Sequence, residues 1–172
     1  NNDLVRLDIM LEQLSKMFKH QAELKGLYFR HDYAKNLPRS IKVDEKRLRQ
    51  ILINLLSNAV KFTDQGGITF TVKYRSHVAR FSVTDTGYGI AQSNIDNIFR
   101  PFERSGAAVE KLIPGSGLGL AICRQLANMM GADIEVASTE GAGSTFTLLL
   151  QASPVHTAMV ETHQVKPISG YL

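Results

Sequence analysis

The chain has 172 residues, of which 44% are hydrophobic and 21% are charged, and its formal net charge is +4. These values are typical of one soluble globular domain that folds without metal or disulfide cross-links. The single cysteine, Cys123, excludes an internal disulfide framework, and no apolar run reaches the ~20 residues of a membrane-spanning helix. The chain begins Asn-Asn-Asp without methionine or a signal peptide, so we expect a cytoplasmic fragment of a longer protein.

The positive charge is concentrated in residues 25–49. This segment has eight Lys or Arg residues against three Asp or Glu residues, a net charge of +5, so the remainder sums to −1. A solvated basic face is the simpler interpretation, because a nucleic-acid groove combines basic with aromatic side chains. Tyr28, Phe29 and Tyr33 lie nearby, but in a segment with the pattern of a strand. We therefore expect no nucleic-acid partner.

Apolar spacing in the first third of the chain predicts two helices and a strand. Leucines at intervals of three and four residues predict a helix over residues 4–18, with Asp3 as its N-cap. Residues 27–33 have the composition of a strand. A second helix is predicted over residues 44–61, with Asp44 at its N-cap.

The middle of the chain combines a hairpin with a long connection. Alternating apolar residues over 68–74 and 79–83 predict two paired strands. Ser93 is a candidate cap for a short helix that ends near residue 99. Residues 103–117 contain several glycines, and a connection of this length in a compact domain is typical of a lid.

A third long helix is predicted over residues 118–130, with Gly131 at its C-terminal end. Apolar residues at 134 and 136 and from 146 to 150 predict two more strands. The order of elements favours an α+β fold, a two-layer α/β sandwich in which helices cover one face of a mixed, mostly antiparallel sheet. We expect one domain over residues 1–150 and a linker or tail over residues 151–172.

The helix predicted from Asp44 is apolar around most of its circumference and carries one polar seam. The seam spans an arc of about 80°, and its members are Arg47, Gln50, Asn54, Asn58 and Lys61. A seam that simply faces water is the alternative, but asparagine forms helices poorly. Amide oxygens can share a hard cation and a lysine can contact a phosphate, so the seam is a candidate ligand site.

Two glycine-containing motifs add to this site. Asp85-Thr86-Gly87-Tyr88-Gly89-Ile90 follows a predicted strand, where an aspartate can accept a hydrogen bond from an exocyclic amine. Alone this motif indicates only a turn. The segment 114–122 places alternating glycines before a helix, as in phosphate-binding helix N-termini, or forms a flexible connection.

Together these motifs resemble the ATP-binding catalytic domain of histidine kinases, within the GHKL (Bergerat-fold) ATPases. NLLSNAVKFT (54–63) resembles the N box, DTGYGI (85–90) the G1 box, and IFRPFERSG (98–106) the F box. GSGLGLAI (115–122) resembles the G2 box, and GSTFTLLL (143–150) the closing strand. The N-box region is especially similar to hybrid sensor kinases.

The resemblance implies ATP and Mg²⁺ as cofactors. Asn58 is the implied Mg²⁺ ligand, with Asn54 assisting the metal or orienting a water, while Lys61 and Arg104 contact phosphate. Asp85 accepts the adenine amino hydrogen. The other implied nucleotide-binding residues are Phe62, Gly87, Gly89, Ile90, Phe102, Gly115, Gly117, Leu118, Gly119, Leu120 and Thr145.

The family transfers the γ-phosphate to a histidine on a separate helical dimerisation domain, and then to a response regulator receiver domain. None of the five histidines here lies in the acceptor context of that family. We therefore expect a monomeric catalytic domain without its substrate histidine.

Two departures from the family pattern support an alternative. Tyr88 stands where a small or aliphatic residue is usual, and Ile113-Pro114 replaces a basic residue in the lid. A nucleotide-binding regulatory module is therefore the second hypothesis. Repair, topoisomerase and anti-sigma ATPases are a third, which Asn54 disfavours because the repair and topoisomerase enzymes usually have a glutamate base there.

Overall fold

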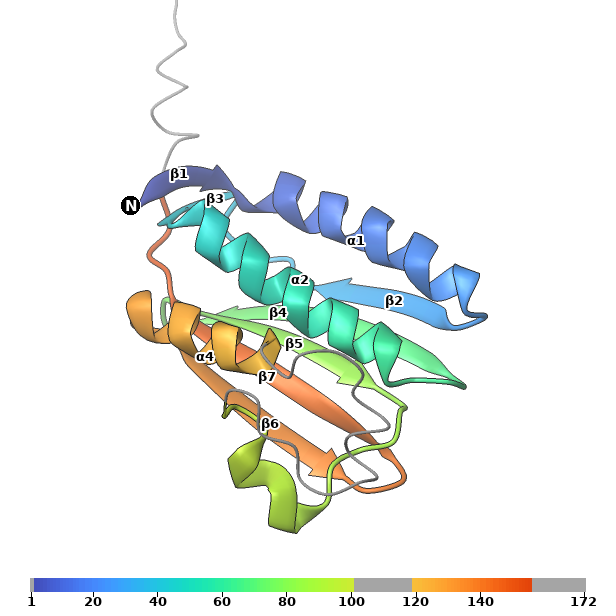
Figure 1. The fold of residues 1–172 in the computed structure, drawn as a ribbon. Coiled ribbons are helices and arrows are strands. Elements are labelled where there is room, and N and C mark those ends of the chain that lie inside the picture. Colours follow the sequence, from blue (N-terminus) through green and yellow to red (C-terminus); the bar gives the residue numbers. More distant parts are fainter. Residues whose placement is uncertain (1, 101–118, 156–172) are drawn as a thin grey trace, which may run out of the picture.

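The computed structural model describes residues 2–100 and 119–155 of the chain (Figure 1). Three long helices cover one face of a five-stranded sheet, as the sequence predicts. The helices are α1 (Leu7–Leu24), α2 (Glu45–Lys61) and α4 (Gly119–Met129), with a short 3₁₀ helix η1 (Gln92–Asn97). The strands are β1 (Asp3–Arg6), β2 (Tyr28–Tyr33), β3 (Ser40–Val43), β4 (Gly67–Arg75), β5 (Val78–Asp85), β6 (Asp133–Thr139) and β7 (Gly143–Gln151).

The main sheet has the strand order β2-β4-β5-β7-β6. β2 pairs with β4 in parallel, and the other three pairs are antiparallel. The predicted hairpin is β4–β5, with Ser76 and His77 both at positive φ in its turn. The predicted α+β sandwich is therefore confirmed.

The core lies between the sheet and the helices. α2 is the central helix, and Ile51, Leu52 and Leu56 are fully buried. The period of two along β5 points Phe81 and Val83 toward the helices. Serine and threonine residues alternate with them on the open face, which is why the helical layer covers only one side of the sheet.

The start of the chain differs from the prediction. Residues 3–6 form β1, antiparallel to β3, and α1 begins only at Leu7 after Arg6 at its N-cap. The prediction of a helix from residue 4 with Asp3 as its cap is therefore wrong. The Leu7 amide donates to the Arg39 carbonyl (2.8 Å), so a long-range pairing decides where this helix begins.

Two other predicted helix ends can be compared with the structure. Asp44 caps α2, because its carboxylate accepts the Arg47 amide at 3.2 Å. Ser93 does not cap η1: the N-cap is Ala91, without a side-chain hydrogen bond, so that prediction is wrong. No helix in the described parts of the chain is long and apolar enough to span a membrane.

Candidate nucleotide site

Asp85 lies at the end of β5, is only 8% exposed and pairs in register with Ser144 of β7. Its Oδ1 accepts hydrogen bonds from the Gly87 amide (2.9 Å) and the Ser144 amide (3.3 Å). Burial raises the pKa of the Asp85 carboxyl above its usual range, although these two hydrogen bonds act in the opposite direction. In the described structure both hydrogen bonds end on one oxygen, so Oδ2 is the atom suited to accept from a ligand.

The loop after Asp85 passes so close to its neighbours that two of its residues must be glycine. A Cβ on Gly87 would lie 2.2 Å from the Phe62 carbonyl oxygen, and one on Gly89 would lie 2.1 Å from the Thr139 carbonyl oxygen. Gly89 also has a φ of +72°, which favours glycine. Both glycines therefore have a structural reason that is independent of any ligand.

A small serine cluster supports the other side of this loop. The Ile90 amide donates to Ser138 Oγ (2.7 Å), which in turn donates to the Gly143 carbonyl (3.0 Å). Ser138 Oγ and Ser144 Oγ are 2.8 Å apart. Sequence reasoning missed both serines. Alternation along β7 puts Ser144 on the same face as Phe146 and Leu148, but only the pairing of β7 with β5 brings it opposite Asp85.

The polar seam of α2 faces the first residue of α4. Asn54 Oδ1 accepts from Gln50 Nε2 (2.9 Å), and Asn54 Nδ2 reaches the Gly119 carbonyl at the limiting distance of 3.5 Å. Asn58 Nδ2 lies 4.0 Å from the position that a Cβ on Gly119 would take. The structure therefore brings Asn54, Asn58 and Gly119 together, and the next residue of α4, Leu120, is buried.

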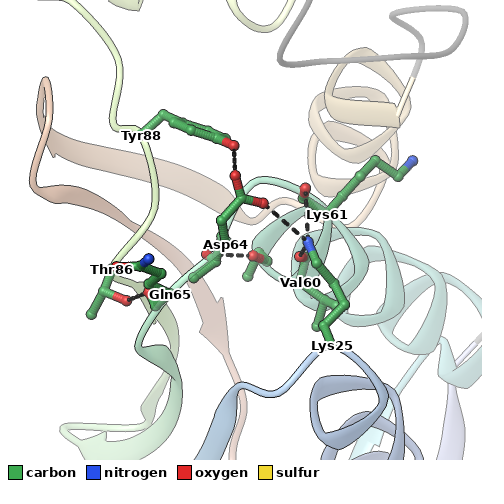
Figure 2. A network of polar contacts seen from close by, with 9 residues as sticks. Lys25, Val60, Lys61, Asp64, Gln65, Thr86 and Tyr88 are labelled. Carbon is green, nitrogen blue, oxygen red and sulfur yellow. Dashed lines mark hydrogen bonds and ion pairs between the residues drawn. The ribbon is translucent and has the colours of Figure 1, made fainter.

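The C-terminal end of α2 connects this seam with the glycine loop. Phe62 is the C-cap, and its carbonyl accepts the Tyr88 amide at 3.3 Å. Lys61 is exposed, and Figure 2 shows its side chain extending away from the neighbouring polar network. Its ammonium therefore takes no part in that network.

One predicted site residue lies on the opposite face of the sheet. Thr145 Oγ1 and Thr84 Oγ1 are 3.0 Å apart, on the side that the helices do not cover. The structure does not bring Thr145 to Asp85; its neighbour Ser144 takes that place.

Several predicted site residues lie outside the described residues: Phe102, Arg104, Gly115, Gly117 and Leu118. The first phenylalanine of the F box is described. Phe99 packs edge-on against Phe146, with 6.3 Å between ring centroids, and the Arg124 guanidinium lies 4.4 Å over its ring. These contacts hold Phe99 against β7 and α4.

The donor set fits a hard cation only through amide oxygens. In the described residues, no group of three or more His, Cys, Asp or Glu side chains is placed to hold a metal ion. Asn54 already uses its oxygen for Gln50, so Asn58 is the better candidate ligand. A single protein ligand suits Mg²⁺, which keeps its waters and takes other oxygens from phosphates.

Comparison with known proteins identifies the class. The family described as histidine kinase-, DNA gyrase B-, and HSP90-like ATPase matches residues 43–154. The full-length structure of ShkA in complex with AMPPNP superposes with a TM-score of 0.79 at 35% identity, covering 90% of this chain and 32% of that one. The catalytic domain of histidine kinase ThkA gives a TM-score of 0.75 at 25% identity, over 90% and 99% of the two chains.

Among curated proteins, the chain is 43% identical to aerobic respiration control sensor protein ArcB of Escherichia coli (strain K12), over 90% of this chain and 20% of ArcB. It is 45% identical to sensor histidine kinase RcsC of Salmonella typhimurium, over 66% of this chain and 12% of RcsC. The match thus spans only 20% of the length of ArcB and 12% of the length of RcsC. It belongs to the histidine kinase-, DNA gyrase B-, and HSP90-like ATPase family, as its motifs predict, and its relatives are sensor histidine kinases.

Proposed function

We propose that the chain binds Mg-ATP and donates the γ-phosphate to a histidine of a separate helical dimerisation domain. The observation that carries this proposal is Asp85, a buried carboxylate whose Oδ1 is fixed by two backbone amides. Such a fixed acceptor distinguishes an adenine amino group from the oxygen of guanine, because only the former donates a hydrogen.

The other proposed residues divide between the end of the site that would hold the base and the end that would hold the phosphates. Phe62, Gly87, Gly89 and Ile90 would surround the base, whereas Asn58, Asn54, Lys61 and the N-terminal end of α4 would face the phosphates. A bound Mg²⁺ would neutralise developing charge on the phosphates. The protein would contribute mainly positioning and fixed positive charge, which suits phosphoryl transfer.

The other residues that we assign to nucleotide binding lie in the lid and the G2 box. We assign Arg104 and Phe102 to the lid side of the nucleotide, and Gly115, Gly117, Leu118, Gly119 and Leu120 to the phosphate side. The parent protein would supply the dimerisation domain, with a receiver domain as acceptor of the phosphoryl group. We place this reaction in the cytoplasm and expect the isolated chain to be monomeric.

Isothermal titration with Mg-ATP tests the binding step. The wild-type chain should bind, and Asp85→Asn and Asn58→Ala should each weaken binding by about 100-fold, or ~2.7 kcal/mol. Asp85→Asn retains an oxygen that can accept the Gly87 and Ser144 amides, so folding should survive. Asn128→Ala on the exposed face of α4 is the control and should bind like the wild type. Unchanged affinity in both site variants would reject the site.

The regulatory-module alternative is favoured by Tyr88. Its hydroxyl donates to the Asp64 carboxylate, so this atypical residue is held by the protein. Transfer from labelled ATP to a supplied dimerisation domain separates the two functions. Binding without transfer would favour the regulatory module, whereas normal transfer would exclude it.

A further inference from the structure

Lys25, Asp64 and Tyr88 form a chain of polar contacts beside the candidate nucleotide site (Figure 2). The Tyr88 hydroxyl donates to Asp64 Oδ2, and Asp64 Oδ1 lies 3.8 Å from Lys25 Nζ. Lys25 Nζ also donates to the carbonyls of Val60 (2.7 Å) and Lys61 (3.3 Å). These contacts join the end of α1, the end of α2 and the glycine loop.

Lys25 occupies a position where a cation is useful. It is the C-cap of α1, yet its ammonium binds the last carbonyl groups of α2. The C-terminal carbonyls of a helix have no partner within the helix and carry partial negative charge. Lys25 therefore ties the ends of two helices together at the residues that precede Phe62.

Tyr88 is held at its backbone as well as at its hydroxyl. Its amide donates to the Phe62 carbonyl (3.3 Å), and its carbonyl accepts the Gly141 amide (2.6 Å). The bond to Asp64 also raises the pKa of the Tyr88 hydroxyl, which keeps it protonated as a donor. Three contacts therefore fix this one residue between α2 and the β6–β7 turn.

We propose that Lys25, Asp64 and Tyr88 are positioning residues for nucleotide binding. They set the spacing between the end of α2, which carries Lys61 and Phe62, and the loop that follows Asp85. Lys25 binds the backbone carbonyl of Lys61, whereas the Lys61 side chain extends away from the network. This inference rests on the proposed function, since it assigns supporting residues to the same site.

The chain of contacts from Lys25 through Asp64 to Tyr88, called the relay below, is partly exposed. This exposure limits how much the relay is expected to stabilise the fold. The side chains of Lys25 and Asp64 are 35% and 61% exposed, and ion pairs of this kind contribute little stability by themselves. The effect should therefore appear in the geometry of the loop and in ligand affinity rather than in global stability.

Titration of Mg-ATP into variants of the 172-residue chain tests the relay. Tyr88→Phe, Asp64→Asn and Lys25→Met should each raise the Kd for Mg-ATP about fivefold. The double variant Tyr88→Phe/Asp64→Asn should have a Kd no higher than that of either single variant, because substitutions within one network are not additive. Lys25→Arg should restore affinity to within about twofold of the wild type, because the charge at the α2 C-terminus is kept.

Two matched controls lie on the sheet away from this site. The Tyr74 hydroxyl donates to the Ala152 carbonyl (2.8 Å), and Lys73 pairs with Asp32 (3.5 Å). Tyr74→Phe and Lys73→Met remove chemically equivalent groups and should leave Kd within about twofold of the wild type, since distant sites act independently. Values within twofold for all three relay variants would overturn the proposal.

Hydrogen exchange without nucleotide separates this proposal from the proposed function. Tyr88→Phe should speed hydrogen exchange of the Gly141 amide about tenfold. This amide donates to the Tyr88 carbonyl, and the substitution releases the residue 88 side chain from Asp64. A wild-type chain that binds no ATP would reject the proposed function, and the exchange rates would then decide the relay. Unchanged Gly141 exchange in that case would overturn it.

Discussion

Around Asp85 the candidate site is held by several hydrogen bonds, whereas the seam of α2 reaches Gly119 through one hydrogen bond at the limiting distance. The Asp85 carboxylate accepts the amides of Gly87 and Ser144, and the Tyr88 amide donates to the carbonyl of Phe62, the C-cap of α2. The link between Asn54 and Gly119 is one side-chain contact at 3.5 Å. The end assigned to the base is therefore preorganised, and the end assigned to the phosphates is formed by groups that can move to meet a ligand.

The largest effect should come from filling space in the preorganised end. Gly89 and Gly131 have nearly the same φ, +72° and +68°, but only Gly89 is crowded: nothing lies within 4 Å of a Cβ on Gly131. Gly131→Ala should cost about 1 kcal/mol from its left-handed backbone alone. Gly89→Ala should cost about 3 kcal/mol or more, because the Thr139 carbonyl must move. Urea unfolding of both variants measures the difference, and equal losses would contradict a rigid loop.

Cys123 reports on the opposite end of the site. It is fully buried in α4, its thiol points at the Ile51 carbonyl (3.8 Å), and burial raises its pKa to about 12. Reaction with a thiol reagent therefore requires α4 to open. We expect opening at a free energy about 2 kcal/mol below global unfolding, while the Ser144 amide exchanges only with global unfolding. Equal opening energies for Cys123 and Ser144 would remove the contrast between the two ends.

The raised pKa of Asp85 gives a smaller effect that depends on pH. Because burial raises this pKa in the folded state, the folded chain binds the proton more tightly than the unfolded chain does. This contribution to stability is present below the ordinary carboxyl pKa of ~3.9 and is lost as the pH rises through the raised folded value.

Asp85→Asn removes the titrating group and serves as the reference. The unfolding free energy of the variant, minus that of the wild type, should rise as the pH increases above the ordinary carboxyl pKa of ~3.9. Urea unfolding at several pH values measures it. A difference that is independent of pH would show that desolvation of Asp85 is offset by its two amide hydrogen bonds.

Local signals in the sequence were sufficient for most of the fold. The Asp44 cap, the β4–β5 hairpin and Gly131, which has a φ of +68°, each follow from neighbouring residues and are confirmed. β1 and β3 were not predicted, since each has four residues and exists through pairing with the other. The leucines near residues 4–7 fit a helical spacing equally well, and only the partner strand decides between the two.

The candidate site was predicted less completely, because motif spacing does not show which way a side chain points. Asn54, Asn58 and Gly119 converge as the motifs imply, and Asp85 is buried at its strand end. The supporting groups Ser138 and Ser144 were missed, since they depend on the pairing of β6 with β7 and of β7 with β5. Arg104 and the lid glycines stay predictions.

The smallest effect is expected at Thr145, where sequence and structure suggest different roles. Its hydroxyl contacts Thr84 on the open face, so Thr145→Val should change the Kd for Mg-ATP by less than about twofold, and stability by ~0.5 kcal/mol. Ser144→Ala removes the contact with Ser138 beside Asp85 and should raise Kd severalfold. Titration of both variants compares the two faces of one strand. Equal losses would mean that the motif position, and not the face of β7, determines which residue serves the nucleotide.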